Sequence, residues 1–388
     1  MQRSPNTTAF VALQSGTPVL LYGVSGSGKT ASSLALARGI NRRLHELVAS
    51  YVDPLDVHGG PFPSKDGSHI AMLDPQWVHD MVEETETTGV KHILSMDEIN
   101  RGSHAVLNSF LKIVAEGKVG NTVLPEDTWI LGACNPPNLD PDVIELSPAM
   151  ANRWYHHQWV LPREAVLQGF AGKLRYPTPD FPVAPDNWTD MIGPVGKTIA
   201  AFHTKCPGYL ELWPDNAAEQ AGPWASPRTW EHLVRCLAVA ESIGCDRDTA
   251  VGAKVTVGRE LMEGLVGKVA ATALETYLDE LDLPDPESLI SAAMTARDAN
   301  LEVDFPEFPG RVDKEIATMG AVQRAIVRDN SRRRWEAAMA MMEVECERKV
   351  DVGLLGASSL IDLAPKGAMA PMSMSQKLFP RLMQVLGN

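Results

Sequence analysis

Short apolar runs bounded by turn-forming residues recur through the amino-terminal part of the chain. They lie at residues 18–22, 47–52, 92–96 and 129–135. Runs of this length and composition predict buried strands, and residues 155–157 predict a further one. Helical spacing returns between the runs: after residue 30, Leu34, Ala37 and Ile40 fall on one face, and another helix is predicted over 76–84. The alternation predicts an α/β core.

Turn residues mark two other segments of this region. Asp53–Asp74 contains several prolines and the pair Gly59-Gly60, which predicts an irregular segment. Lys118–Pro125 places Gly120-Asn121 between β-branched residues, which predicts a hairpin. The residues up to Ser15 predict a short helix.

The pattern changes after residue 163. Residues 176–185 are rich in proline and predict an extended linker. The rest is mostly helical, with helices predicted at residues 188–204, 227–243, 250–281 and 315–349. The tail from Gly353 alternates glycine, serine, proline and methionine, which predicts loose packing. Its candidates for an adaptable contact surface are Met369, Met372, Met374 and Leu378.

Composition places the chain among ordinary globular proteins. It has 388 residues, of which 44% are hydrophobic and 22% are charged. No apolar stretch is long enough to predict a transmembrane helix, and the first residues do not have the pattern of a secretion signal. The five cysteines are scattered without a C-x-x-C pair. They predict reduced thiols in a cytoplasmic protein, and no zinc site is expected from their spacing.

The formal net charge of −14 changes the expected class of partner. A protein that follows a phosphate backbone needs positive charge, so nucleic acid is the less favoured partner. A local basic patch remains compatible with this balance. A protein partner or substrate agrees better with the acidic composition, and no membrane association is expected.

The first candidate site follows the run at 18–22. Residues 23–30 match G-x-x-x-x-G-K-[ST], the pattern of the phosphate-binding loop. This motif requires a strand before it and a helix after it, and both are predicted here. Glycines let backbone N–H groups approach a polyphosphate, and the helix amino terminus favours anions. The predicted phosphate-binding residues are Gly23, Val24, Ser25, Gly26, Ser27, Gly28, Lys29 and Thr30. The Lys29 ammonium would contact the β/γ-phosphates, and the Thr30 hydroxyl would be a ligand of Mg²⁺.

The second candidate site is Asp97-Glu98, at the end of the run at 92–96. Strands often end in acidic turns, so the pair alone indicates little. Together with a phosphate-binding loop it predicts a site for metal and water. Asp97 would hold Mg²⁺ directly or through a water, and Glu98 would orient and polarise the attacking water.

A resemblance to a family begins at this pair. Residues 97–102, D-E-I-N-R-G, resemble the D-E-I-N-R-A stretch of the MoxR-like branch of AAA+ ATPases. Three later segments resemble that branch in the same order. Residues 129–136 end in Asn135-Pro136, as sensor 1 does, and residues 146–154 hold a candidate arginine finger. Residues 225–229 resemble the start of the sensor-2 helix. The resemblance covers about residues 10–290. Departures from the pattern are Ala133-Cys134 in sensor 1, Asn152 for the usual Asp and Trp154 for the usual Phe.

The resemblance implies a role for three polar residues. Asn135 would hydrogen-bond the γ-phosphate or the attacking water. Arg153 would be the arginine finger that reaches the ATP of a neighbouring subunit, and Arg228 would contact the phosphates within its own chain. The plainer alternatives are a turn residue for Asn135, a surface ion pair for Arg153 and an ordinary helix-start arginine for Arg228.

The family also implies an architecture and an activity. The expected parts are a P-loop AAA+ core with a parallel sheet flanked by helices at 1–163, a linker at 164–186, an all-α lid at 187–290 and a carboxyl-terminal helical extension at 291–388. A finger supplied by a neighbour implies a homo-oligomeric ring, by resemblance a hexamer. The expected activity is hydrolysis of ATP with Mg²⁺ to remodel or mature a protein partner. In this branch that partner often has a von Willebrand factor A-type domain.

Two other functions remain open on the same motifs. A nucleic-acid motor, such as a helicase or a restriction-type translocase, would share the core, and stimulation by DNA would distinguish it. A nucleotide-gated scaffold would bind ATP without hydrolysing it, which the presence of Glu98 and Asn135 argues against.

Overall fold

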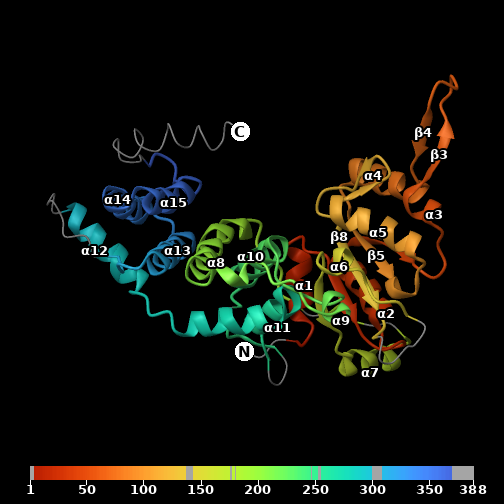
Figure 1. The fold of residues 1–388 in the computed structure, drawn as a ribbon, viewed down its shortest axis with the longest axis horizontal. Coiled ribbons are helices and arrows are strands. Elements are labelled where there is room, and N and C mark those ends of the chain that lie inside the picture. The colour runs from red at the N-terminus through yellow and green to blue at the C-terminus, as the bar shows by residue number, and fades with distance from the viewer. Residues whose placement is uncertain are drawn as a thin grey trace. The chain divides into compact units, whose positions relative to one another are not determined.

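The computed structural model describes residues 4–136, 143–174, 177–179, 181–245, 247–251, 255–298 and 308–368. The chain folds into two compact units, which we treat separately (Figure 1). Unit 1 comprises residues 1–184 and 211–271, and unit 2 comprises residues 185–210 and 272–388. The four-part division expected from the sequence remains a prediction. No helix within the described ranges combines the length and apolar character needed to cross a bilayer.

Unit 1 is built on a five-stranded sheet. The strands are β1 (Val19–Tyr22), β2 (Arg42–Val48), β5 (Lys91–Asp97), β8 (Trp129–Cys134) and β9 (Tyr155–Gln158). Their order is β2-β5-β8-β1-β9, and every neighbouring pair is parallel. All five carboxyl ends therefore share one edge, where β8 lies between β1 and β5. This confirms the predicted α/β class with a parallel sheet flanked by helices.

Helices cover the sheet of unit 1. They include α1 (Thr7–Gln14), α2 (Lys29–Gly39), α4 (Gln76–Thr88), α5 (His104–Glu116) and the short α6 (Pro148–Ala151). Helices α4 and α5 bury Met81 and Phe110 in one cluster with Leu94 and Met96 of β5. In α2 the predicted face is only partly right, because Leu34 is exposed while Ala37 is buried.

Strand β2 corrects the strand predicted at residues 47–52. It runs from Arg42 to Val48, and the chain turns at Ser50. Because β2 is an edge strand of the sheet, much of it is polar and half-exposed. The apolar run therefore marks only its buried end.

The segment predicted to be irregular, residues 53–74, is ordered. It forms the short helix α3 (Pro54–His58) and a hairpin of β3 (Gly60–Pro63) and β4 (Ile70–Leu73), which projects from the core in Figure 1. Prolines are tolerated there because an isolated two-stranded ribbon leaves one side of each strand without ladder hydrogen bonds. The hairpin predicted at 118–125 is confirmed as β6 (Lys118–Val119) and β7 (Thr122–Val123).

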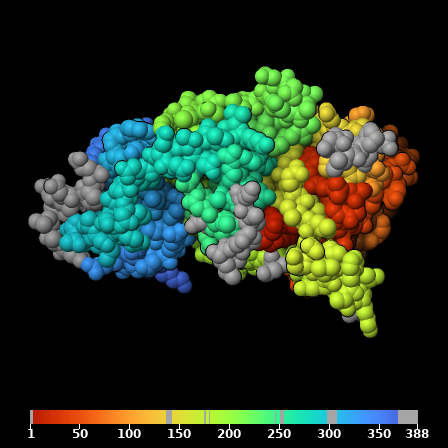
Figure 2. All heavy atoms as spheres, turned by 90° about the horizontal axis from the view of Figure 1, so that it is seen from below, coloured from red at the N-terminus to blue at the C-terminus, as the bar shows by residue number. Residues whose placement is uncertain are grey.

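Two further predictions in unit 1 need correction. Part of the predicted linker is the helix α7 (Arg163–Ala171), which stands out from the surface in yellow-green in Figure 2. The helix predicted at 250–281 begins instead with a small hairpin of β10 (Ala250–Val251) and β11 (Val255–Thr256). Helix α11 (Val257–Asp279) follows and is kinked at Gly267, where φ is +78°. The helices α9 (Ala217–Gln220) and α10 (Pro227–Ser242) complete this part, and α10 agrees with its prediction.

Unit 2 is helical. Its elements are η2 (Trp188–Met191), α8 (Ile192–Lys205), η3 (Pro207–Tyr209), α12 (Pro286–Asp298), α13 (Val312–Arg328), α14 (Arg332–Arg348) and α15 (Val350–Ile361). The single helix predicted at 315–349 is wrong, because Ser331 caps a new helix by accepting from the Arg334 N–H. The tail predicted to be loose from Gly353 is helical to Ile361. The predicted methionine surface at 369–378 lies outside the described residues.

Candidate functional site

The phosphate-binding loop connects β1 to α2 with two glycines in left-handed backbone. Gly26 and Gly28 have φ of +77° and +81°, backbone angles that residues with a Cβ adopt only under strain. A Cβ on Gly26 would meet no atom within 4 Å, so the space beside it is open. Gly23 is needed for another reason: a Cβ there would lie 3.1 Å from the Trp159 Cβ. The predicted strand–turn–helix context of the motif is therefore present.

Lys29 begins α2 and is only 7% exposed. Its ammonium donates to the backbone carbonyls of Gly23 at 2.6 Å and Val24 at 3.1 Å. Burial lowers the pKa of Lys29, while the nearby Asp97 carboxylate acts in the opposite direction. A buried cation that donates to two loop carbonyls is well placed to meet an anion.

Thr30 and Asp97 join the two predicted halves of the site. The Thr30 hydroxyl donates to the Asp97 Oδ2 at 2.6 Å, across 67 residues of sequence. The contact is possible because α2 begins and β5 ends at the same edge of the sheet. A hydroxyl and a carboxylate at this distance are two oxygen ligands of the kind that Mg²⁺ binds.

Glu98 follows β5 in an uncommon backbone conformation. Its φ is +50° and its N–H donates to Asp97 Oδ1 at 2.8 Å. The Ser50 hydroxyl, just after β2, donates to Glu98 Oε2 at 2.6 Å. A residue other than glycine in left-handed backbone carries strain that neighbouring contacts must hold, and such strain is frequent at functional sites.

Asn135 lies directly after β8 and is buried. The Asn100 side chain hydrogen-bonds both backbone groups of Asn135. Asn100 Nδ2 donates to Asn135 O at 2.7 Å, and Asn135 N donates to Asn100 Oδ1 at 3.2 Å. The Gly23 N–H also donates to Cys134 O at 3.2 Å. Asn135 is thus held at the sheet edge between the phosphate-binding loop and Asp97, as the hypothesis for sensor 1 requires.

The two arginines come together in unit 1 rather than standing apart. Burial lowers the pKa of Arg153, and the nearby Arg228 charge lowers it further. Arg153 Nη1 donates to Ala149 O, and Arg228 Nη1 donates to Asn152 Oδ1 at 3.4 Å. That Arg153 reaches a neighbouring subunit remains a prediction.

Asn152 connects α6 to the start of α10. Its Nδ2 donates to Trp224 O at 3.0 Å, and its Oδ1 accepts from the Ser226 hydroxyl at 2.7 Å. Ser226 is the N-cap of α10, two residues before Arg228. A neutral amide, where the resembling family usually has an aspartate, supplies both a donor and an acceptor for this junction.

The residues present fit a nucleotide polyphosphate and Mg²⁺. The Ser27 hydroxyl is buried and has no hydrogen-bond partner in the described part of the chain, although it sits in the turn where a phosphate would be cradled. The Ser27 carbonyl accepts from Trp159 Nε1 at 3.0 Å, and this hydrogen bond helps to hold the loop backbone in place. A buried hydroxyl without a partner is destabilising unless a ligand or a water satisfies it.

Sequence reasoning missed four residues that position this site: Ser50, Asn100, Asn152 and Trp159. Asn100 and Asn152 lie inside the segments 97–102 and 146–154 that resemble family motifs, and this position was a signal that their polar side chains matter. Ser50 and Trp159 are far from the site in sequence and reach it only in the folded chain, so no motif around either residue pointed to a role.

Comparisons with known proteins add a distant likeness. No family model matches the sequence, and no curated protein sequence matches it. Among solved structures, the chain is similar to a protein of Cytophaga hutchinsonii described as a candidate ATPase. The sequence identity is 16% and the TM-score 0.42, over 71% of this chain and 88% of that one. A likeness this distant identifies neither a substrate nor a partner, and the assignment of an α/β P-loop core with a helical part rests on the sheet and loop described above.

Proposed function

We propose that the protein is an AAA+ ATPase of the MoxR-like kind that hydrolyses ATP with Mg²⁺. The observation that carries the proposal is the 2.6 Å hydrogen bond from Thr30 to Asp97. It joins a phosphate-binding loop to an acidic strand end, with Glu98 next in sequence. Loop, metal ligand and water-orienting carboxylate are the parts that phosphoryl transfer needs.

Each residue has a defined task in this proposal. The loop N–H groups and Lys29 would bind the phosphates, and Thr30 and Asp97 would hold Mg²⁺, which would neutralise charge on the phosphates. Glu98 accepts a hydrogen bond from the attacking water and aligns it. Asn135, which follows β8 next to β1, would hydrogen-bond the γ-phosphate or that water. Arg228 contacts the phosphates from the start of α10.

We propose further that the active unit is a cytoplasmic ring, by resemblance a hexamer, that remodels a protein partner. The support is the resemblance of residues 146–154 to a segment that supplies a finger in trans. An arginine in trans contributes about 10³–10⁵ in rate in related nucleotide hydrolases. A partner with a von Willebrand factor A-type domain is the expectation for this branch. The acidic net charge of −14 supports a protein over nucleic acid.

The experiment is ATP turnover by wild type and Glu98→Gln, with nucleotide binding measured on both. Glu98→Gln keeps the size of the side chain but removes the carboxylate, so we expect turnover to fall by at least about 10² while ATP still binds. The matched control is Glu116→Gln, an exposed glutamate at the end of α5, which should keep wild-type turnover. Equal turnover by wild type and Glu98→Gln would contradict the proposal. Strong stimulation by DNA that weakens steeply with salt would instead favour a nucleic-acid motor.

A further inference from the structure

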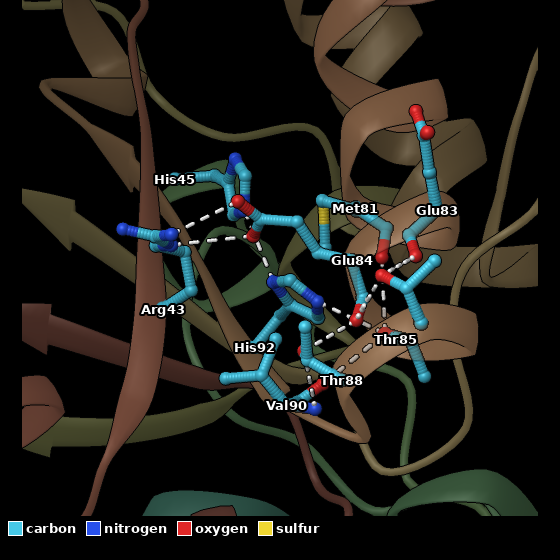
Figure 3. Close-up of polar contacts among 10 residues, drawn as sticks. Arg43, His45, Met81, Glu83, Glu84, Thr85, Thr88, Val90 and His92 are labelled. Atoms are coloured by element: carbon cyan, nitrogen blue, oxygen red, sulfur yellow. Dashed lines mark hydrogen bonds and ion pairs between the residues drawn. The ribbon is translucent and has the colours of Figure 1, made fainter.

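Two histidines and a glutamate converge away from the nucleotide site. They are His45 of β2, His92 of β5 and Glu84 of α4, and one ligand atom of each lies within 4.8 Å of the others. Figure 3 shows the three side chains pointing toward one another in the space between the strands and α4. In the register of β2 with β5, His92 is paired with Arg43 and His45 with Leu94, so the two imidazoles are diagonal neighbours.

The hydrogen bonds of Thr85 decide which nitrogen of His92 carries the proton. The Thr85 hydroxyl donates to a backbone carbonyl, of Met81 at 3.0 Å or of Val90 at 3.2 Å. It must then accept from His92 Nε2, which lies 2.9 Å away. His92 Nδ1 is left with its lone pair, and that lone pair faces His45. Metal-binding histidines typically donate their other ring N–H to a neighbouring acceptor, which fixes the tautomer in this way.

The spacing of the ligand atoms is close to that of a metal site. His45 Nε2 and His92 Nδ1 are 3.0 Å apart. Two ligands of a tetrahedral zinc ion, each about 2.0–2.1 Å from it, are separated by about 3.3 Å. An ion could bind if His45 Nε2 and His92 Nδ1 moved apart by a few tenths of an ångström. His45 would then be in the tautomer that carries its proton on Nδ1. Glu84 then supplies a carboxylate oxygen.

We propose that His45, Glu84 and His92 bind a divalent transition-metal ion of the zinc class. Two imidazoles and one carboxylate are a donor set that zinc accepts, with a fourth position for water. His92 is five residues before Asp97, so the ion would lie roughly 16 Å from the proposed Mg²⁺ ligands at a rise of about 3.3 Å per residue. The ion would tie the edge strand β2 and helix α4 to β5, independently of the proposed ATPase function.

Arg43 is the competitor for this site. Its guanidinium donates to both oxygens of Glu84, at 3.0 and 3.2 Å, and its side chain is 61% exposed. Without an ion, this pair holds the carboxylate beside the imidazoles. An exposed arginine can turn into solvent when the ion binds, so its removal should favour the metal.

The test is titration of the untagged, chelator-treated full chain with Zn²⁺, and with Co²⁺ followed by visible absorption. We expect one ion per chain, bound more than about 100-fold more weakly by His45→Ala and by Glu84→Gln. Thr85→Val should weaken binding by about 10–100-fold. The matched control is His79→Ala, an exposed histidine on α4, which should bind like wild type. His45 and Glu84 are only partly buried, so their variants should fold, which circular dichroism would check.

Two results would overturn the proposal. One is the absence of a stoichiometric site in wild type, and the other is equal binding by His45→Ala and His79→Ala. Arg43→Gln provides an independent check, because we expect it to bind the ion more tightly than wild type. Unchanged or weaker binding by Arg43→Gln would contradict the placement of the ion against Glu84.

Discussion

At the scale of single residues, the contact between Thr30 and Asp97 joins a specific motif, the phosphate-binding loop, to a weaker one, the acidic pair at 97–98. Each motif alone has a plainer explanation, a glycine-rich loop or an acidic turn. Their hydroxyl and carboxylate are 2.6 Å apart in the folded chain. The motifs predict which residues take part, but only the folded structure shows that the Thr30 hydroxyl and the Asp97 carboxylate are in contact.

Thr30 gives a direct prediction about Mg²⁺. Thr30→Val removes the hydroxyl and keeps the shape, so the Mg²⁺ concentration needed for half-maximal ATP turnover should rise by about 10–100-fold or more. Thr30→Ser keeps the hydroxyl and should stay near wild type. A Mg²⁺ titration of turnover for the three proteins checks this. The same Mg²⁺ requirement for Thr30→Val as for wild type would exclude Thr30 as a ligand.

Glu260 predicts a pH dependence of stability. Burial raises its pKa from 4.5 to about 7, and Oε1 lies 3.4 Å from His157 Nδ1. The folded state therefore holds this proton more tightly than the unfolded state, and the contribution of Glu260 to stability falls as the pH rises from about 4.5 to about 7. His157 acts oppositely over much of the same range, because burial lowers its pKa from 6.5 to about 4 and its contribution to stability falls as the pH drops between those values.

The variant that isolates this effect is Glu260→Gln, which cannot ionise. Relative to wild type, it should gain up to about 3 kcal/mol of unfolding free energy between pH 4.5 and pH 7, since one pKa unit corresponds to about 1.4 kcal/mol. Denaturant unfolding of both proteins across that range measures the difference. A difference that stays constant with pH would show that Glu260 does not titrate as described.

At the scale of elements, buried runs were predictable and edge elements were not. Strands β5 and β8 are buried over most of their length and carry runs of mainly apolar residues, so their sequences alone indicate them. Strand β2 was placed too late in the sequence and the hairpin of β3 and β4 was missed, because exposed strands need no continuous apolar run. The break between α13 and α14 was missed although the polar residues 329–331 precede α14, and Ser331 caps it.

Helix α15 gives a stability prediction with its own control. A Cβ on Gly353 would lie 2.4 Å from the backbone nitrogen of Cys346, which cannot move aside. A Cβ on Gly356 would meet the flexible Met342 side chain, with its sulfur at 2.3 Å. Gly353→Ala should therefore destabilise unit 2 by about 1–3 kcal/mol, and Gly356→Ala by less. Thermal unfolding of the two variants compares them, and equal effects would contradict the described packing of α15 on α14.

At the scale of the whole molecule, the strand order assembles the candidate site. Placing β8 between β1 and β5 brings Asn135 to the edge shared by the phosphate-binding loop and Asp97. Sequence reasoning predicted the strands and their polar ends but not this order, because pairing between distant strands leaves no local pattern.

In the proposed ring, ATP is hydrolysed at a site that a neighbouring copy of the chain completes. The measurement that tests it is ATP turnover in mixtures of Arg153→Ala with Glu98→Gln. Each variant alone should be nearly inactive. In a ring, an Arg153→Ala copy keeps Glu98 and can receive the finger of a Glu98→Gln neighbour, so mixing equal amounts should restore roughly a quarter of wild-type turnover through random assembly. If both variants assemble with each other and the mixture stays inactive, the claim is contradicted.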